Sequence, residues 1–199
     1  MKEYSYDKLL NIKTNGKGIP NQLSHYHPYE PTPYEALETL FRQYEVKSSD
    51  HFVDFGCGLG RLNFFIHFFH HASVVGIEMN EDFHKKALQN RDHYAKKTKN
   101  KVEKIIFKNC RAEDYEISEK DNRFYFFNPF SVHIFQHIIN RILLSVEESP
   151  REVDIILYYP SEDYVFHLEN QSVFRLVQEI VIPGYFEKNS NERFLIYRL

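Results

Sequence analysis

The sequence contains no tryptophan and only two cysteines, Cys57 and Cys110, among its 199 residues. Two cysteines are too few for a disulfide framework, so we expect a reduced, cytoplasmic protein. No apolar run approaches the roughly 18 residues that a membrane span needs. The opening residues, MKEYSYDK, lack the apolar core of a signal peptide. The sequence therefore predicts no membrane partner and no secretion signal.

A strong excess of charge of either sign is also missing. The formal net charge is −3 at pH 7, and charged residues make up 27% of the chain. Such a balance gives no general attraction to polyanions, so it favours a small molecule or a protein side chain as the partner, with nucleic acid not excluded. The length suits a single domain with a sizeable core, and the sequence assigns no oligomeric state.

Glycine is scarce, and three of the seven glycines fall in one short stretch, Gly56 to Gly60. A β-type run, residues 51–55, precedes the stretch, and an amphipathic run with helical spacing follows it. Glycine reaches positive φ without steric cost and lets a ligand approach the backbone closely. A strand, a glycine turn and a helix N-terminus together form a site for a nucleotide-like ligand.

Two acids accompany this turn. Glu78 ends the next β-type run, roughly 20 residues beyond the first glycine, where an acid suits a ribose diol. Asp54 precedes Gly56 within the first run. The glycine spacing is G-x-G-x-G, and Arg61 stands where the dinucleotide fingerprint has its third glycine, which speaks against NAD.

This combination of strand, acids and glycines resembles motif I of the class I S-adenosylmethionine-dependent methyltransferases. The resemblance implies that S-adenosyl-L-methionine is the cofactor and that Asp54 helps to hold its methionine part. It further implies that the glycine turn passes under the cofactor and that Glu78, with Met79 beside it, binds the ribose. The cofactor-binding residues that we expect around the turn are Asp54, Gly56, Cys57, Gly58, Gly60, Glu78 and Met79.

The resemblance also implies the fold. It predicts an α/β, Rossmann-like, doubly wound sheet of seven mostly parallel strands in the order 3-2-1-4-5-7-6. The last strand runs antiparallel, and helices cover both faces. The likeness extends over residues 33–199, which we expect to form a single methyltransferase domain. Besides residues 51–55 and 73–80, the β-type runs are 104–110, 123–130, 153–160, 174–182 and 193–199, and helical patterns cover 33–46, 80–97 and 131–146.

A second motif, Asn128-Pro129-Phe130, ends the fourth predicted strand, whose tip faces the glycine turn. It resembles the (Asp/Asn)-Pro-Pro-(Tyr/Phe) motif of methyltransferases that act on amino groups, with one proline missing. The resemblance implies catalytic roles for all three residues. Asn128, which also adjoins the cofactor, would orient the acceptor nitrogen, and Phe130 would stack on the acceptor. The alternative is an ordinary proline turn in which Asn128 caps the next helix.

The end of the third predicted strand departs from the family pattern. Arg111 stands where the resemblance implies an acid that binds the adenine amino group. The backbone N–H of Ala112 could still serve the adenine ring, and Glu113 is a possible substitute acid. We therefore count Ala112 and Glu113 among the cofactor-binding candidates.

The first 32 residues are polar and punctuated by glycine and proline, so we expect an N-terminal arm or lid with little regular structure. Its aromatic residues either pack on the domain or cover the cofactor or acceptor pocket. Thr32 is predicted to cap the helix that starts at Pro33, with Glu35 at its third position. The aromatic and histidine side chains in question are His25, Tyr26, His27, Tyr29 and Tyr34.

Three further features suggest other chemistry. The spacing of His67, His70 and His71 places them on one helix face, but metal binding needs more ligands, so we assign no metal. Tyr158 and Tyr159 end the fifth predicted strand and could line the acceptor pocket. Five lysines crowd residues 96–104, and we expect them to form a solvated loop at the edge opposite to the chemistry.

The sequence thus predicts an S-adenosylmethionine-dependent methyltransferase that acts on a nitrogen of a small molecule or a protein side chain. An alternative acceptor is an RNA base. The alternatives of another class are a non-enzymatic nucleotide-binding module and a NAD-dependent oxidoreductase. The intact pair Asp54 and Glu78 speaks against the first of these, and the glycine spacing speaks against the second.

Overall fold

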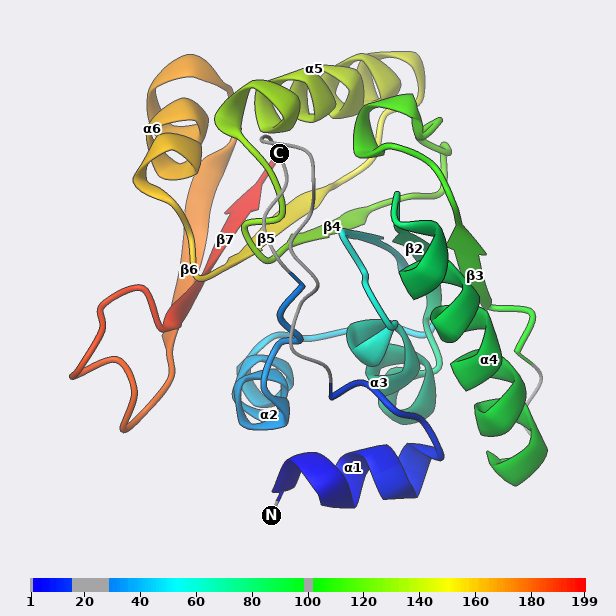
Figure 1. Cartoon of the computed structure of the whole chain (residues 1–199). Coiled ribbons are helices and arrows are strands. Elements are labelled where there is room, and N and C mark those ends of the chain that lie inside the picture. Colours follow the sequence, from blue (N-terminus) through cyan, green and yellow to red (C-terminus); the bar gives the residue numbers. More distant parts are fainter. Residues whose placement is uncertain (1, 16–28, 99–101) are drawn as a thin grey trace.

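The computed structural model describes residues 2–15, 29–98 and 102–199. A single sheet of seven strands runs through the molecule in the order β3-β2-β1-β4-β5-β7-β6 (Figure 1). All neighbours pair in parallel except β7, which is antiparallel to β5 and β6. The predicted strand order and the antiparallel last strand are confirmed.

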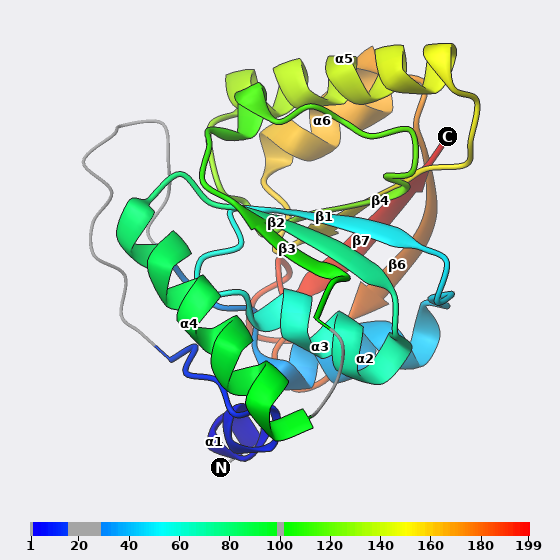
Figure 2. The same ribbon diagram turned by 90° about the vertical axis from the view of Figure 1, so that its right-hand side faces the viewer.

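The strands have the following bounds: β1 His51–Phe55, β2 Ser73–Ile77, β3 Ile105–Lys108, β4 Arg123–Phe126, β5 Asp154–Tyr158, β6 Arg175–Val181 and β7 Arg193–Arg198. The helices are α1 Lys2–Leu10, α2 Tyr34–Gln43, α3 Arg61–His70, α4 Glu81–Thr98, α5 Val132–Glu148 and α6 Glu162–Gln171, with a short 3₁₀ helix, η1, at Ala112–Asp114. Helices α5 and α6 cover one face of the sheet, and α2, α3 and α4 cover the other, with α1 beneath them (Figure 2).

Two hydrophobic cores follow from the alternation of side chains along the strands. In β1, Phe52 packs on the side of α2 and α3, whereas Val53 and Phe55 face α5. In β5, Ile156 and Leu157 divide in the same way. Both faces of the central strands are therefore buried, which explains why these strands read as continuous apolar runs.

Helix α4 begins where the sequence indicates. The Asn80 side-chain oxygen accepts hydrogen bonds from the N–H groups of Asp82 (3.0 Å) and Phe83 (3.1 Å), which satisfies two donors of the first turn. The N-cap residue of α2, however, is Pro33 rather than Thr32. The Thr32 hydroxyl is instead paired with the hydroxyl of Tyr125 at 2.8 Å, so it ties the chain to β4.

The expectation of little regular structure in the N-terminal arm is wrong for its first part, because Lys2–Leu10 form helix α1. Buried Leu10 and half-buried Tyr6 pack into the core beside Tyr34, whose ring stacks on that of Tyr6 at 4.6 Å. Tertiary packing of this kind stabilises a helix that the sequence pattern alone does not reveal. His25, Tyr26 and His27 lie outside the described residues.

Candidate functional site

The glycine turn joins β1 to α3 at the carboxyl end of the parallel strands. Gly56 has φ of 80°, and a Cβ atom there would lie 2.7 Å from the Cβ of Pro129. Gly58 has φ of 54°, and a Cβ there would lie 2.0 Å from the ring of Tyr29. Both the backbone conformation and the close neighbours therefore require glycine at these two positions.

Glu78 follows β2 and is bound to the glycine turn. Its carboxylate accepts hydrogen bonds from the N–H of Gly58 at 2.9 Å and from the N–H of Asn80 at 2.7 Å. The residue is 7% exposed, and burial raises the pKa of its carboxyl group, while the N–H donors act in the opposite direction. An acid beside the turn is thus in place, as the sequence predicts.

Asp54 lies next to the end of β1 and is also buried. With its amide nitrogen turned toward this residue, Asn63 donates to the Asp54 carboxylate at 3.0 Å. Burial raises the pKa of Asp54 to about 8, and the negative charge of Glu78 adds to the shift. Within residues 2–15, 29–98 and 102–199, neither acid has a lysine or arginine in salt-bridge contact. The two acids are therefore suited to a ligand that brings positive charge or hydrogen-bond donors.

The Asn128-Pro129-Phe130 turn packs directly on the glycine turn through Pro129. Asn128 has φ of 40°, a conformation that non-glycine residues adopt rarely and that often marks functional sites. The N-cap of α5 is Ser131. Asn128 therefore lies three residues before the N-cap position of α5.

The Phe130 ring is 1% exposed and packs in the core near Phe126 and Tyr164. Its carbonyl oxygen accepts a hydrogen bond from the Tyr164 hydroxyl at 2.6 Å. A ring buried in this way has little surface on which an acceptor could stack. The half-buried ring of Phe127 is better placed to contact a ligand, because Phe127 directly precedes Asn128 and lines both cavities of the site.

These parts enclose a cavity of about 70 Å³. A second cavity of about 30 Å³ adjoins it, because both are lined by Gly56, Tyr29 and Phe127. Of the predicted residues, Gly56, Glu78, Met79, Ala112, Asn128, Pro129 and Phe130 line the larger cavity, and Asp54, Gly56 and Cys57 line the smaller one. The structure therefore brings most of the candidates from four strand ends to one place.

Three candidates lie outside both cavities, namely Gly58, Gly60 and Glu113. The ring of Tyr29 covers Gly58. Gly60 is the N-cap residue of α3 and packs against Phe107. Glu113 forms an ion pair with Arg111. Arg111 is exposed, so the pair lies at the surface beside η1, whereas Ala112 lines the larger cavity.

Tyr29 is the main residue of the site that sequence reasoning placed only vaguely. Its ring lies on Gly58 and 5.1 Å from the ring of Phe83, and its hydroxyl donates to the Thr14 carbonyl at 2.8 Å. The sequence marked Tyr29 as an aromatic of the arm, but it gave no sign that Phe83, within α4, would face it. Glu30 and Phe83 also line the larger cavity.

Arg61 holds the arm beside the site. Its guanidinium group donates to the hydroxyl of Thr14 at 2.8 Å, to the side chain of Asn15 at 2.7 Å and to the carbonyl of Thr32 at 3.1 Å. It also forms an ion pair with Glu3. The residue is 3% exposed. An arginine in place of a third glycine thus fastens both described parts of the arm to the start of α3, a role that the sequence did not reveal.

The other candidate residues are occupied in ways that favour structure. His67 is buried and shares a hydrogen bond of 2.8 Å with Tyr94. Tyr158 donates to Glu192 at 2.6 Å, and Tyr159 accepts from Asn189 at 2.7 Å, so both tyrosines hold the β6–β7 connection. In the described part of the chain, no three histidine, cysteine or acidic side chains are grouped as metal ligands would be. No helix of that part is long and apolar enough to span a bilayer.

Comparison with known proteins agrees with this architecture. A family model described as a methyltransferase domain matches residues 32–157, more than half of the chain. The comparison with curated protein sequences gives no match.

Solved structures of similar fold include an RNA methyltransferase from Salinibacter ruber in complex with S-adenosyl-L-homocysteine. It is 17% identical, with a TM-score of 0.56, over 85% of this chain and 92% of that one. A SAM-dependent methyltransferase from Thiobacillus denitrificans, also in complex with S-adenosyl-L-homocysteine, is 11% identical, with a TM-score of 0.56, over 84% and 91% of the two chains. Likenesses at this level of identity establish the fold.

Proposed function

The chain belongs to the methyltransferase domain family, and from this premise we propose that it transfers the methyl group of S-adenosylmethionine to an acceptor nitrogen. The observation that carries the proposal is the pair of buried acids, Asp54 and Glu78, on either side of a glycine turn. The structures of similar fold that contain S-adenosyl-L-homocysteine support the choice of cofactor. The two free cysteines are consistent with the cytoplasmic location that we also propose.

The chemistry of the lining residues suits this cofactor, but the two cavities, of about 70 and 30 Å³, are smaller than the whole molecule, so Tyr29 has to move for it to enter. Glu78 offers a carboxylate for ribose hydroxyls, and Asp54 offers one for the ammonium group of the methionine part. Gly56 lines both cavities, so a ligand there meets the backbone of the turn without an intervening side chain. Bound S-adenosylmethionine would supply a methyl carbon that its positive sulfur already activates. The protein then has to position the acceptor, keep its nitrogen neutral and exclude water.

Asn128 is the residue that we propose for orienting the acceptor. It lies at the tip of β4 beside Pro129, which touches the glycine turn. Its amide oxygen would accept a hydrogen bond from the acceptor N–H, which fixes the direction of the nitrogen lone pair. The apolar walls that Phe127 and Pro129 provide disfavour the protonated form of an amine and so lower its pKa. Asn128 has no basic group, so it orients without removing a proton.

The acceptor nitrogen that we propose belongs to a small molecule or a protein side chain, because the chain as a whole is weakly acidic. A second candidate is an RNA base. The description of the structurally similar Salinibacter ruber protein as an RNA methyltransferase supports it, and so does a flat ring, Phe127, beside Asn128.

The rival functions fit the site less well. A NAD-dependent oxidoreductase needs a third glycine where Arg61 makes its network of bonds to the arm. A binding module without chemistry is disfavoured by the intact pair of buried acids, Asp54 and Glu78, beside the glycine turn.

We also propose that residues 1–32 form a lid over a domain that comprises residues 33–199. Support comes from Tyr29, whose ring covers Gly58. Further support comes from Arg61, which donates hydrogen bonds to Thr14 and to Thr32 in the arm. Hydrogen exchange measured with and without S-adenosyl-L-homocysteine tests the lid. Slower exchange at residues 2–15 and 29–32 supports it, and unchanged exchange there indicates simple packing.

Methyl transfer by an Asn128→Ala variant tests the function. Radioactive methyl from S-adenosylmethionine is followed into the small-molecule, protein and RNA fractions of a cell extract. We expect N-methylated product from the wild type. Loss of the orienting bond should lower the rate of Asn128→Ala by about a hundredfold or more, with little change in cofactor affinity. Asn170→Ala, an exposed change on α6, is the matched control. A product methylated on oxygen, carbon or sulfur, or a fully active Asn128→Ala protein, would contradict the proposal.

A further inference from the structure

A third and larger cavity lies between α1 and α4, with a volume of about 930 Å³. We call it the α1–α4 cleft and define it by Tyr4, Lys8, Lys13, Lys96 and Lys97, which line it. Helix α1 lies beside the C-terminal half of α4, below the sheet (Figures 1 and 2). The cleft is separate from the glycine turn, and the methyl-transfer site does not account for it.

The α1–α4 cleft is basic although the chain is acidic overall. Its four lysines are exposed, and two of them, Lys96 and Lys97, lie in the last turn of α4 rather than in the loop that the sequence predicts. Asp7 is the single acid that lines the cleft within the described residues, and it is 7% exposed. Its carboxylate is turned inward, where it accepts hydrogen bonds from Thr14 at 2.8 Å and Tyr34 at 2.7 Å. The lysine charges are therefore not neutralised inside the cleft, which favours an anionic partner.

The cleft is joined to the glycine turn by Asn90. This α4 side chain accepts a hydrogen bond from the Lys13 N–H at 2.9 Å and donates to the Lys13 carbonyl at 3.1 Å. The same amide nitrogen donates to the carbonyl of Leu59, within the glycine turn, at 3.0 Å. The wall of the cleft is thus tied to the glycine turn at Asn90, while Lys96 and Lys97, in the last turn of α4, lie toward the opposite edge of the sheet.

An exposed aromatic ring accompanies the lysines. Tyr4 is 71% exposed at the edge of the cleft. Lysines that neutralise phosphates, together with an exposed ring on which a base can stack, are the combination that binds single-stranded nucleic acid. An acidic peptide would use the lysines but would leave the ring without a planar partner.

We infer that the α1–α4 cleft binds the phosphate backbone of a single-stranded RNA segment, with a base stacked on Tyr4. The inference rests on the second acceptor class of the proposed function, an RNA base. It adds the surface that holds the remainder of such a substrate while one base reaches the site beside Asn128.

Fluorescence anisotropy with a labelled single-stranded RNA, on full-length protein without cofactor, tests the inference. Lys8→Glu/Lys96→Glu changes one lysine on each wall of the cleft. We expect it to weaken binding at least about tenfold and to lower the slope of log affinity against log salt by about 1.4, since each phosphate contact contributes about 0.7. Lys120→Glu/Lys188→Glu changes the net charge equally at exposed positions elsewhere. It should change the affinity less than about twofold.

Tyr4→Ala separates stacking from charge. The loss of one stacked base should weaken binding by about fivefold or more, while the salt slope stays unchanged because no phosphate contact is removed. Thermal unfolding of every variant shows whether it is folded. An unchanged affinity of folded Tyr4→Ala would contradict the assignment of this ring.

Two results would overturn the inference. They are the absence of salt-dependent RNA binding by the wild type and equal weakening by the two double variants. Displacement of the RNA by polyglutamate at matched charge concentration would instead indicate an acidic protein partner. Calorimetry with S-adenosyl-L-homocysteine, on the wild type and on Lys8→Glu/Lys96→Glu, keeps the two proposals distinct. If the wild type binds the cofactor but not RNA, only this inference fails. If the wild type does not bind the cofactor, the proposed function fails.

Discussion

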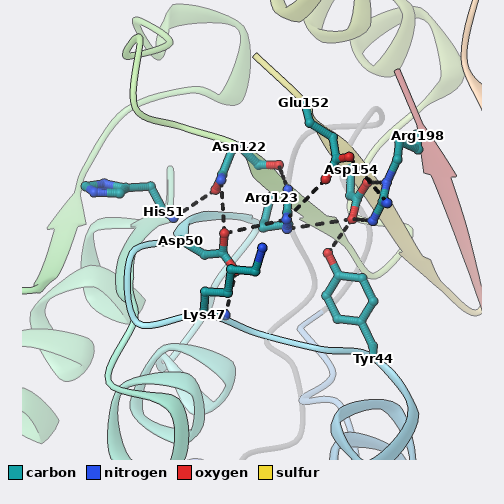
Figure 3. Close-up of polar contacts among 9 residues, drawn as sticks. All are labelled: Tyr44, Lys47, Asp50, His51, Asn122, Arg123, Glu152, Asp154 and Arg198. Atoms are coloured by element: carbon teal, nitrogen blue, oxygen red, sulfur yellow. Dashed lines mark hydrogen bonds and ion pairs between the residues drawn. The ribbon is translucent and has the colours of Figure 1, made fainter.

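Buried acids lie at both ends of the sheet, and the two ends treat them differently. At the amino ends of the strands, Asp50 and Asp154 are 3% and 0% exposed, and arginines accompany them (Figure 3). Arg198 donates to Asp154 at 2.7 Å, and Arg123 lies 3.5 Å from Asp50 and 3.6 Å from Asp154. At the carboxyl ends, the partners of Asp54 and Glu78 among the described residues are uncharged N–H groups.

This difference indicates what each group of acids does. The chain neutralises Asp50 and Asp154 itself, because Arg123 joins the start of β4 to the loop before β1 and to the start of β5. Such a network holds strands in register and needs no ligand. The pair Asp54 and Glu78 keeps a raised pKa at a site with open cavities, which is typical of a place where a ligand supplies the missing charge.

Arg123→Ala gives the largest effect expected at the amino end. It leaves two buried carboxylates without this cation, so we expect a loss of about 3–5 kcal/mol in the free energy of unfolding, measured with urea. Arg193→Ala, which removes a surface ion pair with Glu179, should cost less than about 1 kcal/mol. Equal losses of unfolding free energy in the two variants would show that the buried network stabilises the protein no more than a surface ion pair does. The folded Arg123→Ala protein should keep its cofactor affinity.

Glu78→Ala should lower the cofactor affinity, which Arg123→Ala leaves unchanged. Removal of a charge-assisted hydrogen bond to the ribose should weaken cofactor binding by about 1.5–3 kcal/mol. Calorimetry with S-adenosyl-L-homocysteine measures the change. Glu78→Gln keeps the acceptor for the Gly58 N–H and separates the charge from the shape. Glu81→Ala, at an exposed residue paired with Lys85, is the control. An unchanged affinity of Glu78→Ala would remove the ribose role of this acid.

The Asp54→Asn variant tests the raised pKa of Asp54 through the pH dependence of protein stability. The native carboxyl group holds its proton up to a pKa of about 8, whereas the unfolded one loses it near 3.8. Wild-type stability should therefore fall as pH rises between these values, and the variant should escape this fall. From pH 6 to pH 7 we expect the Asp54→Asn variant to gain about 1.4 kcal/mol relative to wild type in urea unfolding. Asp114→Asn, an exposed change, serves as the control, and parallel pH curves for Asp54→Asn and wild type would refute the assignment.

The sequence predicts the fold well, and Glu78 lies beside the glycine turn as the sequence indicates, for physical reasons. Glycine turns and acids at strand ends are local sequence patterns. The start of α4 is also local, because the Asn80 side chain caps the helix that follows it. The sheet order followed from the family resemblance around Asp54, Gly56 and Glu78, and the strand pairing confirms it.

What the sequence did not reveal depends on contacts between distant segments. Helix α1 is stabilised by packing against Tyr34, and Arg61 binds residues of the arm that lie 29 to 58 positions away. The burial of Phe130 follows from its neighbours in the core. Helix α6, capped by Ser161, was also missed, because its short apolar pattern is weak.

Titration calorimetry of S-adenosylmethionine and S-adenosyl-L-homocysteine tests the central claim most directly, namely that the acids without cations form a cofactor site. An ammonium group placed beside Asp54 lowers the pKa of that carboxyl from about 8, so binding at pH 7 should release about one proton. Titrations in two buffers of different ionisation enthalpy measure this release. We predict binding of both sulfur ligands at one site per chain, with proton release, and no binding of NAD. Folded protein that gives no heat with either sulfur ligand would contradict the account.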